Sequence, residues 1–264
     1  MRSNFAYNID YGSYQKMLNN YASEYKNQVR TLNKNLNKIK EHKSTISLNY
    51  KDHVKPFDYV DILYPKANVQ NANVYQCSSS YLSKIGYKGV GGFFERINQT
   101  IIIGSDLDFN DKSEFDIITD ISVDEILVHE LLHYAYFAIG CCTTSLELSE
   151  EFAYGNSINY LRQNGRTDED IINKNFMPFL VMTLDKGRIY KDVLSESDYS
   201  WQLYCGFSDN KKKNIYDKLK NRFKEKIVKL AREKGKILIE AYRDEEHFIV
   251  EPIREENSFK FLDI

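Results

Sequence analysis

The chain has 264 residues and a mass of 31.0 kDa, with 42% hydrophobic and 28% charged residues, which is typical of a soluble globular protein that can bury a substantial core. Its formal net charge is −2 and its isoelectric point is about 6.2, so no overall attraction to nucleic acid or to an anionic membrane is expected. We therefore expect neither nucleic acid nor a membrane as a partner.

Localisation is predicted from what the sequence lacks. It shows no charged-then-apolar leader with a small-residue cleavage site and no apolar run of membrane-spanning length, so a cytoplasmic location is expected. The preference for Asn, Lys, Ile, Tyr and Asp, which AT-rich codons encode, is typical of a bacterial or phage genome, and a phage protein would instead be incorporated in the virion. The cysteines Cys77, Cys141, Cys142 and Cys205 form no regular framework, which favours free thiols in a reducing compartment.

The first predicted element is a long amphipathic helix from Tyr11 to about His42. Its apolar residues are three or four positions apart and form one narrow stripe, similar to a stuttered heptad repeat. The stripe consists of Tyr14, Leu18, Tyr21, Tyr25, Val29, Leu32, Leu36 and Ile39. Such a stripe cannot form a core of its own, so the helix must pack on the body of the protein, on another copy, or on a partner.

Short strands are expected between residues 44 and 65, where Pro56 and Pro65 interrupt a loosely alternating pattern. A polar connection follows from Lys66 to Asn73. The next stretch, Val74 to Ile85, fits a helix and a strand equally well.

A β-hairpin is the next prediction. Two runs rich in β-formers, around Gly92–Arg96 and Thr100–Ile103, flank a short polar turn at residues 97–99. Gly91 and Gly92 have no side chain where a strand would expose its backbone, so either another chain approaches closely there or the strand bends. An acidic loop, Asp106 to Asp120, is expected after the hairpin.

The stretch from Val123 to Gly140 contains the sequence His129-Glu130-Leu131-Leu132-His133. Ser122 and Glu125 predict a capping box, and the apolar residues behind them recur at helical spacing. On a helix the two histidines lie on one face, one turn apart, and can bind one zinc ion with Glu130 beside it. The alternative is two histidines on a half-buried helix face without a metal.

A catalytic zinc ion typically has three protein ligands and a fourth position for water, so a third ligand must come from elsewhere. A second helix is predicted from about Ser145 to Arg162, and it carries Glu147, Glu150 and Glu151. Cys141 and Cys142, which precede this helix, are either additional ligands or small buried hydrophobic residues.

The remaining chain is predicted to be mostly helical. Thr167 caps a third helix, and a long basic helix is expected from Ser208 or Asp209 to about Lys234. Its basic face is either solvated or in contact with an acidic partner. Strands at Lys236–Arg243 and His247–Val250 and an apolar docking tail are expected to follow.

The segment Leu148-Ser149-Glu150-Glu151-Phe152-Ala153 resembles the L-S-E-G-x-A pattern that follows the HExxH helix in gluzincin metallopeptidases, the zincins whose third zinc ligand is a glutamate on the next helix. The resemblance implies that Glu150 is this ligand. Glu151 stands where the family has glycine and is the alternative ligand. The resemblance covers about residues 85–162, and it includes the hairpin, which is similar to the zincin strand pair whose outer edge pairs with a peptide substrate.

The resemblance further implies zinc-dependent hydrolysis of peptide bonds. Zinc lowers the pKa of its bound water from 15.7 to about 7, and Glu130 would take the proton of this water and pass it to the leaving amine. An additional donor to the transition state is expected, for which Tyr154, Tyr204 and His247 are the candidates. The other two histidines, His42 and His53, are expected to be surface or structural residues.

We expect an α+β, zincin-like fold, with a small mixed or antiparallel sheet from residues 44–104 against the metal helix and a mostly helical second half. The expected parts are a helical arm (1–43), a metallopeptidase domain (44–250) and a docking tail (251–264). The expected function is that of a metallopeptidase with one Zn²⁺ per chain and a peptide or protein substrate. The alternative is a zincin-derived structural protein of a phage virion or other large assembly, with zinc structural or absent. In that case the arm and the tail would mediate contacts within a homo-oligomer or a larger assembly.

Overall fold

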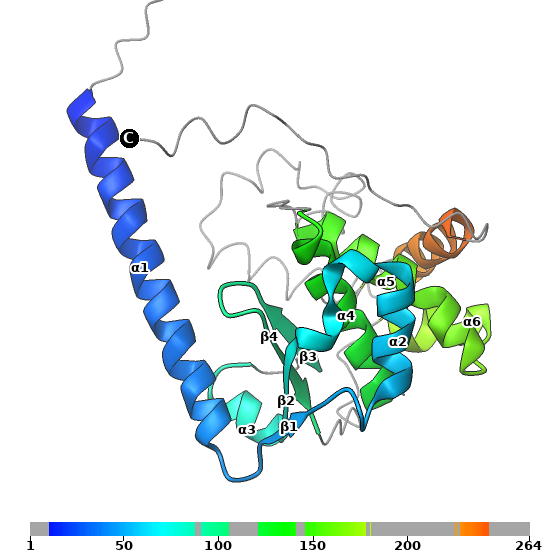
Figure 1. Ribbon diagram of the computed structural model, residues 1–264. Helices are drawn as coiled ribbons and strands as arrows, with labels where there is room; N and C mark the ends of the chain where they lie inside the picture. The colour runs from blue at the N-terminus through cyan, green and yellow to red at the C-terminus, as the bar shows by residue number, and fades with distance from the viewer. Residues whose placement is uncertain are drawn as a thin grey trace, which may run out of the picture.

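The computed structural model describes residues 11–87, 91–105, 121–140, 146–177, 180, 225 and 228–242, and the fold is given for these. It is mixed α/β and mostly helical, with one small sheet of four strands (Figure 1). The elements, in chain order, are α1 (Tyr11–Glu41), β1 (Ile46–Leu48), α2 (Val54–Leu63), the 3₁₀ turns η1 (Pro65–Ala67) and η2 (Val69–Asn71), β2 (Asn73–Cys77), α3 (Ser79–Lys84), β3 (Gly92–Glu95), β4 (Thr100–Gly104), α4 (Val123–Ala138), α5 (Leu146–Gln163), α6 (Asp168–Asp170) and the π-helical turn η3 (Ile171–Phe176). Residues 228–241 are also helical.

The sheet has the strand order β1-β2-β4-β3, and it is mixed because β2 and β4 run parallel while the two outer pairs are antiparallel. Its inner strand β4 is buried along its whole length, which explains the uninterrupted apolar run in the sequence. Side chains alternate across the sheet: Ile101 and Ile103 join the core around α4, whereas Ile102 joins the core beneath α1. Of the two predicted alternatives, a mixed or an antiparallel sheet, the structure has the mixed one, and the predicted hairpin of β3 and β4 is confirmed.

The sheet lies between two helical layers. On one face, α4 packs with α2 and α5 around the largest core cluster. On the other face, α1 and α3 cover a smaller cluster that contains Leu36, Ile39 and Leu82. A third cluster joins α5 and η3 to the helix at 228–241.

The helix α4 lies at the centre of this arrangement. As predicted, Ser122 caps it, and Glu125 completes a capping box with two reciprocal hydrogen bonds. Most of its residues are buried, on nearly every side of the helix. The predicted second helix is confirmed as α5, the main packing partner of α4, and Thr167 caps α6 with a capping box to Asp170.

The prediction of strands up to residue 65 is wrong beyond β1, because residues 54–63 form the helix α2. Pro56 is the third residue of this helix. A proline is tolerated in the first turn, where the backbone N–H groups have no intrahelical acceptor. Pro65 follows the helix end and begins η1, so the two prolines flank a helix and do not interrupt strands. The ambiguous stretch from residue 74 divides into β2 and α3.

The prediction of a strand at Lys236–Arg243 is also wrong, because residues 228–241 are helical. Its buried residues Ala231, Gly235 and Ile239 are spaced by four, while Ile237 is 65% exposed. The short apolar run was consistent with a strand, but the spacing of the buried residues is that of a helix.

The long helix at the N-terminus is confirmed as α1, and its last third packs on the body of the protein. There the apolar stripe joins the smaller core cluster beneath the sheet through Leu32, Leu36 and Ile39. In addition, Asn33 accepts a hydrogen bond of 2.8 Å from the side chain of Asn98 in the hairpin turn. Residues 22–28 are exposed, and the helix extends well away from the sheet (Figure 1).

Several predicted features lie outside the described residues. They are the acidic loop Asp106–Asp120, the first part of the long basic helix, the strand at His247–Val250, the tail 251–264, and Cys141, Cys142 and Cys205. Cys77 is a free, buried thiol. None of the helices in the described part of the chain combines the length and the apolar character that a membrane span requires.

A buried ion pair connects the start of α4 to the end of α5. The guanidinium of Arg166 donates to both carboxylate oxygens of Glu125, at 2.7 and 3.1 Å, and the two side chains are only 17% and 5% exposed. Since Glu125 is also the capping-box residue of α4, this pair holds α4 and α5 together at one end.

We expect Arg166→Met to lower the free energy of unfolding by about 3 kcal/mol, because it leaves the carboxylate of Glu125 buried without its partner. The matched control is Arg162→Met, which removes the more exposed pair of Arg162 and Asp168 and should cost less than about 1 kcal/mol. Urea denaturation followed by circular dichroism measures both values. Equal losses in the two variants would contradict this role of the pair.

Candidate metal centre

The contact between α4 and α5 brings three potential ligands together. His129 and His133 lie one turn apart on α4, and Glu150 lies in the first part of α5. The two Nε2 atoms are 3.0 Å apart, and Oε2 of Glu150 lies 3.2 Å from Nε2 of His129 and 3.4 Å from Nε2 of His133. Among the described residues, these three form the only cluster of histidine, cysteine and acidic side chains that could hold a metal ion.

The spacing of these atoms fits a tetrahedral metal ion. Ligands about 2.0–2.1 Å from a tetrahedral ion are separated from each other by roughly 3.3 Å, which follows from the angle between them. The three measured separations, from 3.0 to 3.4 Å, are close to this value. A donor set of two imidazoles and one carboxylate suits a divalent metal ion, and the described residues leave one tetrahedral position open.

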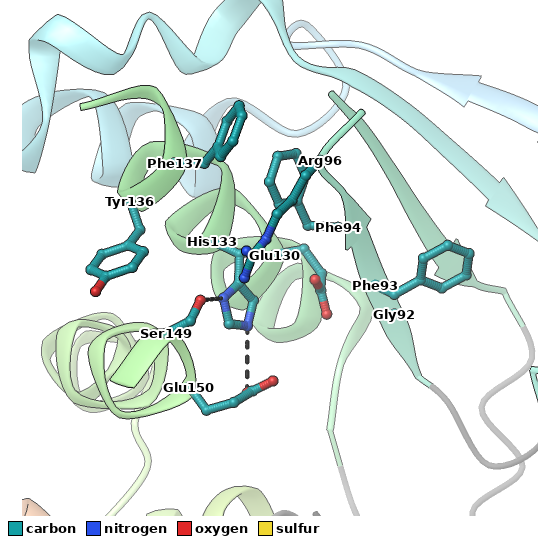
Figure 2. Close-up of a pocket in the computed structure, with 10 residues that line it drawn as sticks. All are labelled: Gly92, Phe93, Phe94, Arg96, Glu130, His133, Tyr136, Phe137, Ser149 and Glu150. Carbon is teal, nitrogen blue, oxygen red and sulfur yellow. Dashed lines mark hydrogen bonds and ion pairs between the residues drawn. The ribbon is translucent and has the colours of Figure 1, made fainter. Parts of the chain in front are cut away.

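The orientation of His133 is set by its second ring nitrogen. Nδ1 of His133 lies 2.8 Å from the hydroxyl of Ser149, a buried residue next to Glu150 in the sequence. This contact turns Nε2 toward Glu150 (Figure 2), and the same atom lies next to Nε2 of His129. The ring of His129 is held differently, against the ring of Tyr154 at a centroid distance of 4.3 Å, and its buried Nδ1 has no hydrogen-bond partner among the described residues.

Glu130 lies beside the ligands, between α4 and the edge strand β3. Its side chain is buried, and a side-chain carbon added at Gly92 would be 3.1 Å from its Oε1 and 2.7 Å from Cγ2 of Ile126. Glycine is therefore needed at position 92 for β3 to approach α4. Burial raises the pKa of Glu130 to about 8; the carboxylate of Glu150 adds to the rise, while His133 and a backbone hydrogen bond from Phe94 oppose it.

The pKa of Glu150 is shifted in the opposite direction. Burial alone would raise it, but hydrogen bonds and charge interactions with His129 and His133 outweigh burial and hold the pKa well below its usual range. Its neighbour Glu151 is exposed on α5. The geometry therefore brings Glu150, and not Glu151, to the two histidines.

Of the three predicted donors to the transition state, only Tyr154 is among the described residues; Tyr204 and His247 lie outside them. Burial, together with the carboxylates of Glu150 and Glu130, raises the pKa of Tyr154 well above its usual value, so its hydroxyl keeps its proton. The two described histidines outside the motif make structural contacts. His53 lies 2.8 Å from Asp124, and His42 stacks on Tyr81.

A cavity of about 230 Å³ opens beside the ligands, between β3 and the second half of α4 (Figure 2). Its lining residues are Gly92, Phe93, Phe94, Arg96, Glu130, His133, Tyr136, Phe137, Ser149 and Glu150. A molecule bound in this cavity would contact the three ligands, Glu130 and the edge of the sheet together.

Three features of the site are not evident from the sequence pattern. The hydroxyl of Ser149 and the backbone N–H of Phe94 reach the site only through the packing of α5 and β3 on α4. Arg96 comes from the hairpin turn. The only sequence signal for any of them is the position of Ser149 directly before the predicted ligand.

Comparisons with known proteins gave no match to a family model, to a curated protein or to a solved structure.

The ligand set predicts the response of metal binding to substitution. Glu150→Gln should weaken zinc affinity by more than about 100-fold. Loss of a hydrogen bond to a ligand typically lowers metal affinity by about 10–100-fold, and loss of the ligand itself should lower it further. The matched control Glu151→Gln should bind zinc as the parent does. Elemental analysis and competition with a chromogenic chelator measure both; equal affinities in the two variants would contradict the assignment.

Ser149→Ala should weaken zinc affinity by about 10–100-fold, because His133 loses the contact that orients its ring. The control is Ser157→Ala on the same helix, whose hydroxyl donates to the backbone oxygen of Tyr154 and does not contact the ligands. The same chelator competition applies, and an unchanged affinity in Ser149→Ala would show that this contact does not orient the ligand.

Proposed function

We propose that this protein is a zinc-dependent metallopeptidase of the gluzincin type. The observation that carries the proposal is the convergence of His129, His133 and Glu150 within 3.4 Å of one another, next to the buried carboxyl of Glu130. The resemblance of the HExxH and L-S-E segments to those of gluzincins supports the same function, and so does the nearby edge strand.

Zinc bound to this ligand set would supply Lewis-acid chemistry, lowering the pKa of a bound water to about 7 and polarising a peptide carbonyl. His129, His133 and Glu150 would hold the ion. Ser149 would keep His133 in the required orientation, and Tyr154 would do the same for the ring of His129.

Glu130 would act as the proton carrier. Its buried position beside the three ligand candidates suits a group that accepts a proton from water and then releases it to the leaving amine. The hydrogen bond from the backbone of Phe94 holds the carboxylate in place for both transfers.

The substrate would bind along β3. Gly91 accepts a hydrogen bond from Gly104 in β4, and since antiparallel pairs alternate, the backbone groups of Gly92 and Phe94 are directed away from β4. The N–H of Phe94 donates to Glu130, which leaves the carbonyl of Phe94 and the backbone groups of Gly92 for pairing with a peptide. In the described sheet β3 is an edge strand, so an extended peptide can pair with it there. Such pairing would bring a peptide carbonyl to the metal ligands.

We expect Glu130→Gln to lower the rate of peptide hydrolysis by about 10²–10⁴-fold, because it removes the general base. Zinc content should stay at one ion per chain, since Glu130 is not a ligand. Hydrolysis of a fluorogenic casein substrate, with elemental analysis of the same samples, tests both points, and Glu151→Gln serves as the control. A Glu130→Gln protein as active as the parent would overturn the proposal.

A second candidate function is a structural role in a phage virion or another large assembly. It is favoured by α1, whose exposed part includes Tyr25 at 61% exposure. Light scattering after size exclusion separates the two candidates: a large ring or particle without hydrolysis supports the structural role, and an active protein of about 31.0 kDa supports the peptidase.

A further inference from the structure

The cavity beside the candidate metal centre has an aromatic wall and one cationic side chain. Phe94 packs in the core against Tyr134 and Phe137, at ring distances of 5.7 and 5.9 Å. Arg96 is an exposed residue directly after β3, and its side chain extends into the cavity toward His133 (Figure 2).

Side chains alternate along β3: Phe94 packs on the core around α4, and Phe93 packs on the core beneath α1. Arg96 is the first residue of the turn that follows, and it lines the cavity from there. The carboxylate of Glu95 accepts hydrogen bonds of 2.7 Å from the backbone N–H groups of Ile97 and Asn98. Glu95 therefore stabilises the turn that carries Arg96.

The acidic and histidine side chains that line the cavity are those of the candidate metal centre and of Glu130 beside it. Glu150 is paired with the two histidines, Glu130 accepts a hydrogen bond from Phe94, and His133 is a ligand candidate. Arg96 is the only other charged residue among the described residues that line the cavity. Its planar guanidinium has a shape that matches a carboxylate, and the aromatic wall suits the methylene part of such a side chain.

We propose that Arg96 selects substrates with an acidic side chain next to the scissile bond, and that this side chain enters the cavity. The inference rests on the proposed peptidase function, and it adds the substrate class. A peptide paired with β3 would have its scissile carbonyl at the ligands, so the side chain of an adjacent residue is the group that reaches the cavity. A volume of about 230 Å³ has room for one glutamate or aspartate side chain.

The first experiment is a cleavage profile. The zinc-loaded full chain is incubated with a random peptide library, and the residues on both sides of each cut are identified by mass spectrometry. Glutamate and aspartate should be enriched at one position next to the cut. The enrichment should disappear in Arg96→Ala and change to lysine and arginine in Arg96→Glu, while Arg232→Ala, an exposed arginine that does not line the cavity, should behave as the parent.

The second experiment uses a pair of peptides that differ only by Glu or Gln at the selected position. A charge-assisted pair with Arg96 should favour the Glu peptide in kcat/KM on the order of 10-fold to 100-fold. In Arg96→Ala the ratio should approach one, while Arg232→Ala should keep the ratio of the parent. Circular dichroism and zinc content verify that the variants are folded and loaded.

The possible failures are distinguishable. Cleavage without acidic enrichment, or with the same enrichment in Arg96→Ala, overturns this inference and leaves the peptidase proposal standing. Absence of cleavage by a zinc-loaded protein overturns the peptidase proposal. That result overturns this inference as well, because the inference rests on cleavage, whereas loss of the acidic preference alone overturns only this inference.

Discussion

The close packing of α4 on α5 is the interaction on which the candidate site depends. Each helix brings buried polar groups to the contact: His133 from α4, and Ser149 from α5. Buried polar groups need hydrogen-bond partners, and here these two residues are partners of each other. The same contact sets the separation of the three ligand atoms. The ion pair of Glu125 and Arg166 at the far end of the two helices fixes their relative position, so the geometry of the site follows from helix packing and not from a flexible loop.

The two carboxyl groups of the site have opposite environments. Both Glu130 and Glu150 are removed from water, but Glu150 faces two imidazoles while Glu130 faces a backbone N–H and the glycine of an edge strand. Their pKa values are consequently shifted in opposite directions. Neighbouring carboxyl groups with divergent pKa values commonly divide tasks, one remaining ionised and the other exchanging protons. The proposed assignment of Glu150 as ligand and Glu130 as proton carrier agrees with this division.

The sequence predicted the parts of this arrangement that depend on local signals. The capping box at Ser122, the spacing of the histidines and the turn of the hairpin all act within a few residues, and α4, α5 and the β3–β4 pair are where they were expected. It did not predict α2, because a proline in the first turn of a helix looks the same as a proline that ends a strand. The sequence also did not predict that the helix at 228–241 continues past residue 234. There the residues that pack on α5 and η3 are four positions apart, and this packing favours a helix over a strand. In the site, the motif identified the ligand candidates, but the contacts of Ser149 and Phe94 arise only from tertiary packing.

The hairpin lies between the site and α1. One face of it lines the cavity through Phe94, while the opposite face packs beneath α1 through Phe93, and the turn is bonded to Asn33 of α1. A four-residue strand held from both sides cannot shift toward one helix without a change in its contacts to the other. By thermodynamic reciprocity, if a ligand of α1 changes the affinity of β3 for the proposed peptide by some factor, the peptide changes the affinity of α1 for that ligand by the same factor. The exposed arm and the cavity are therefore the two ends of one potential allosteric linkage.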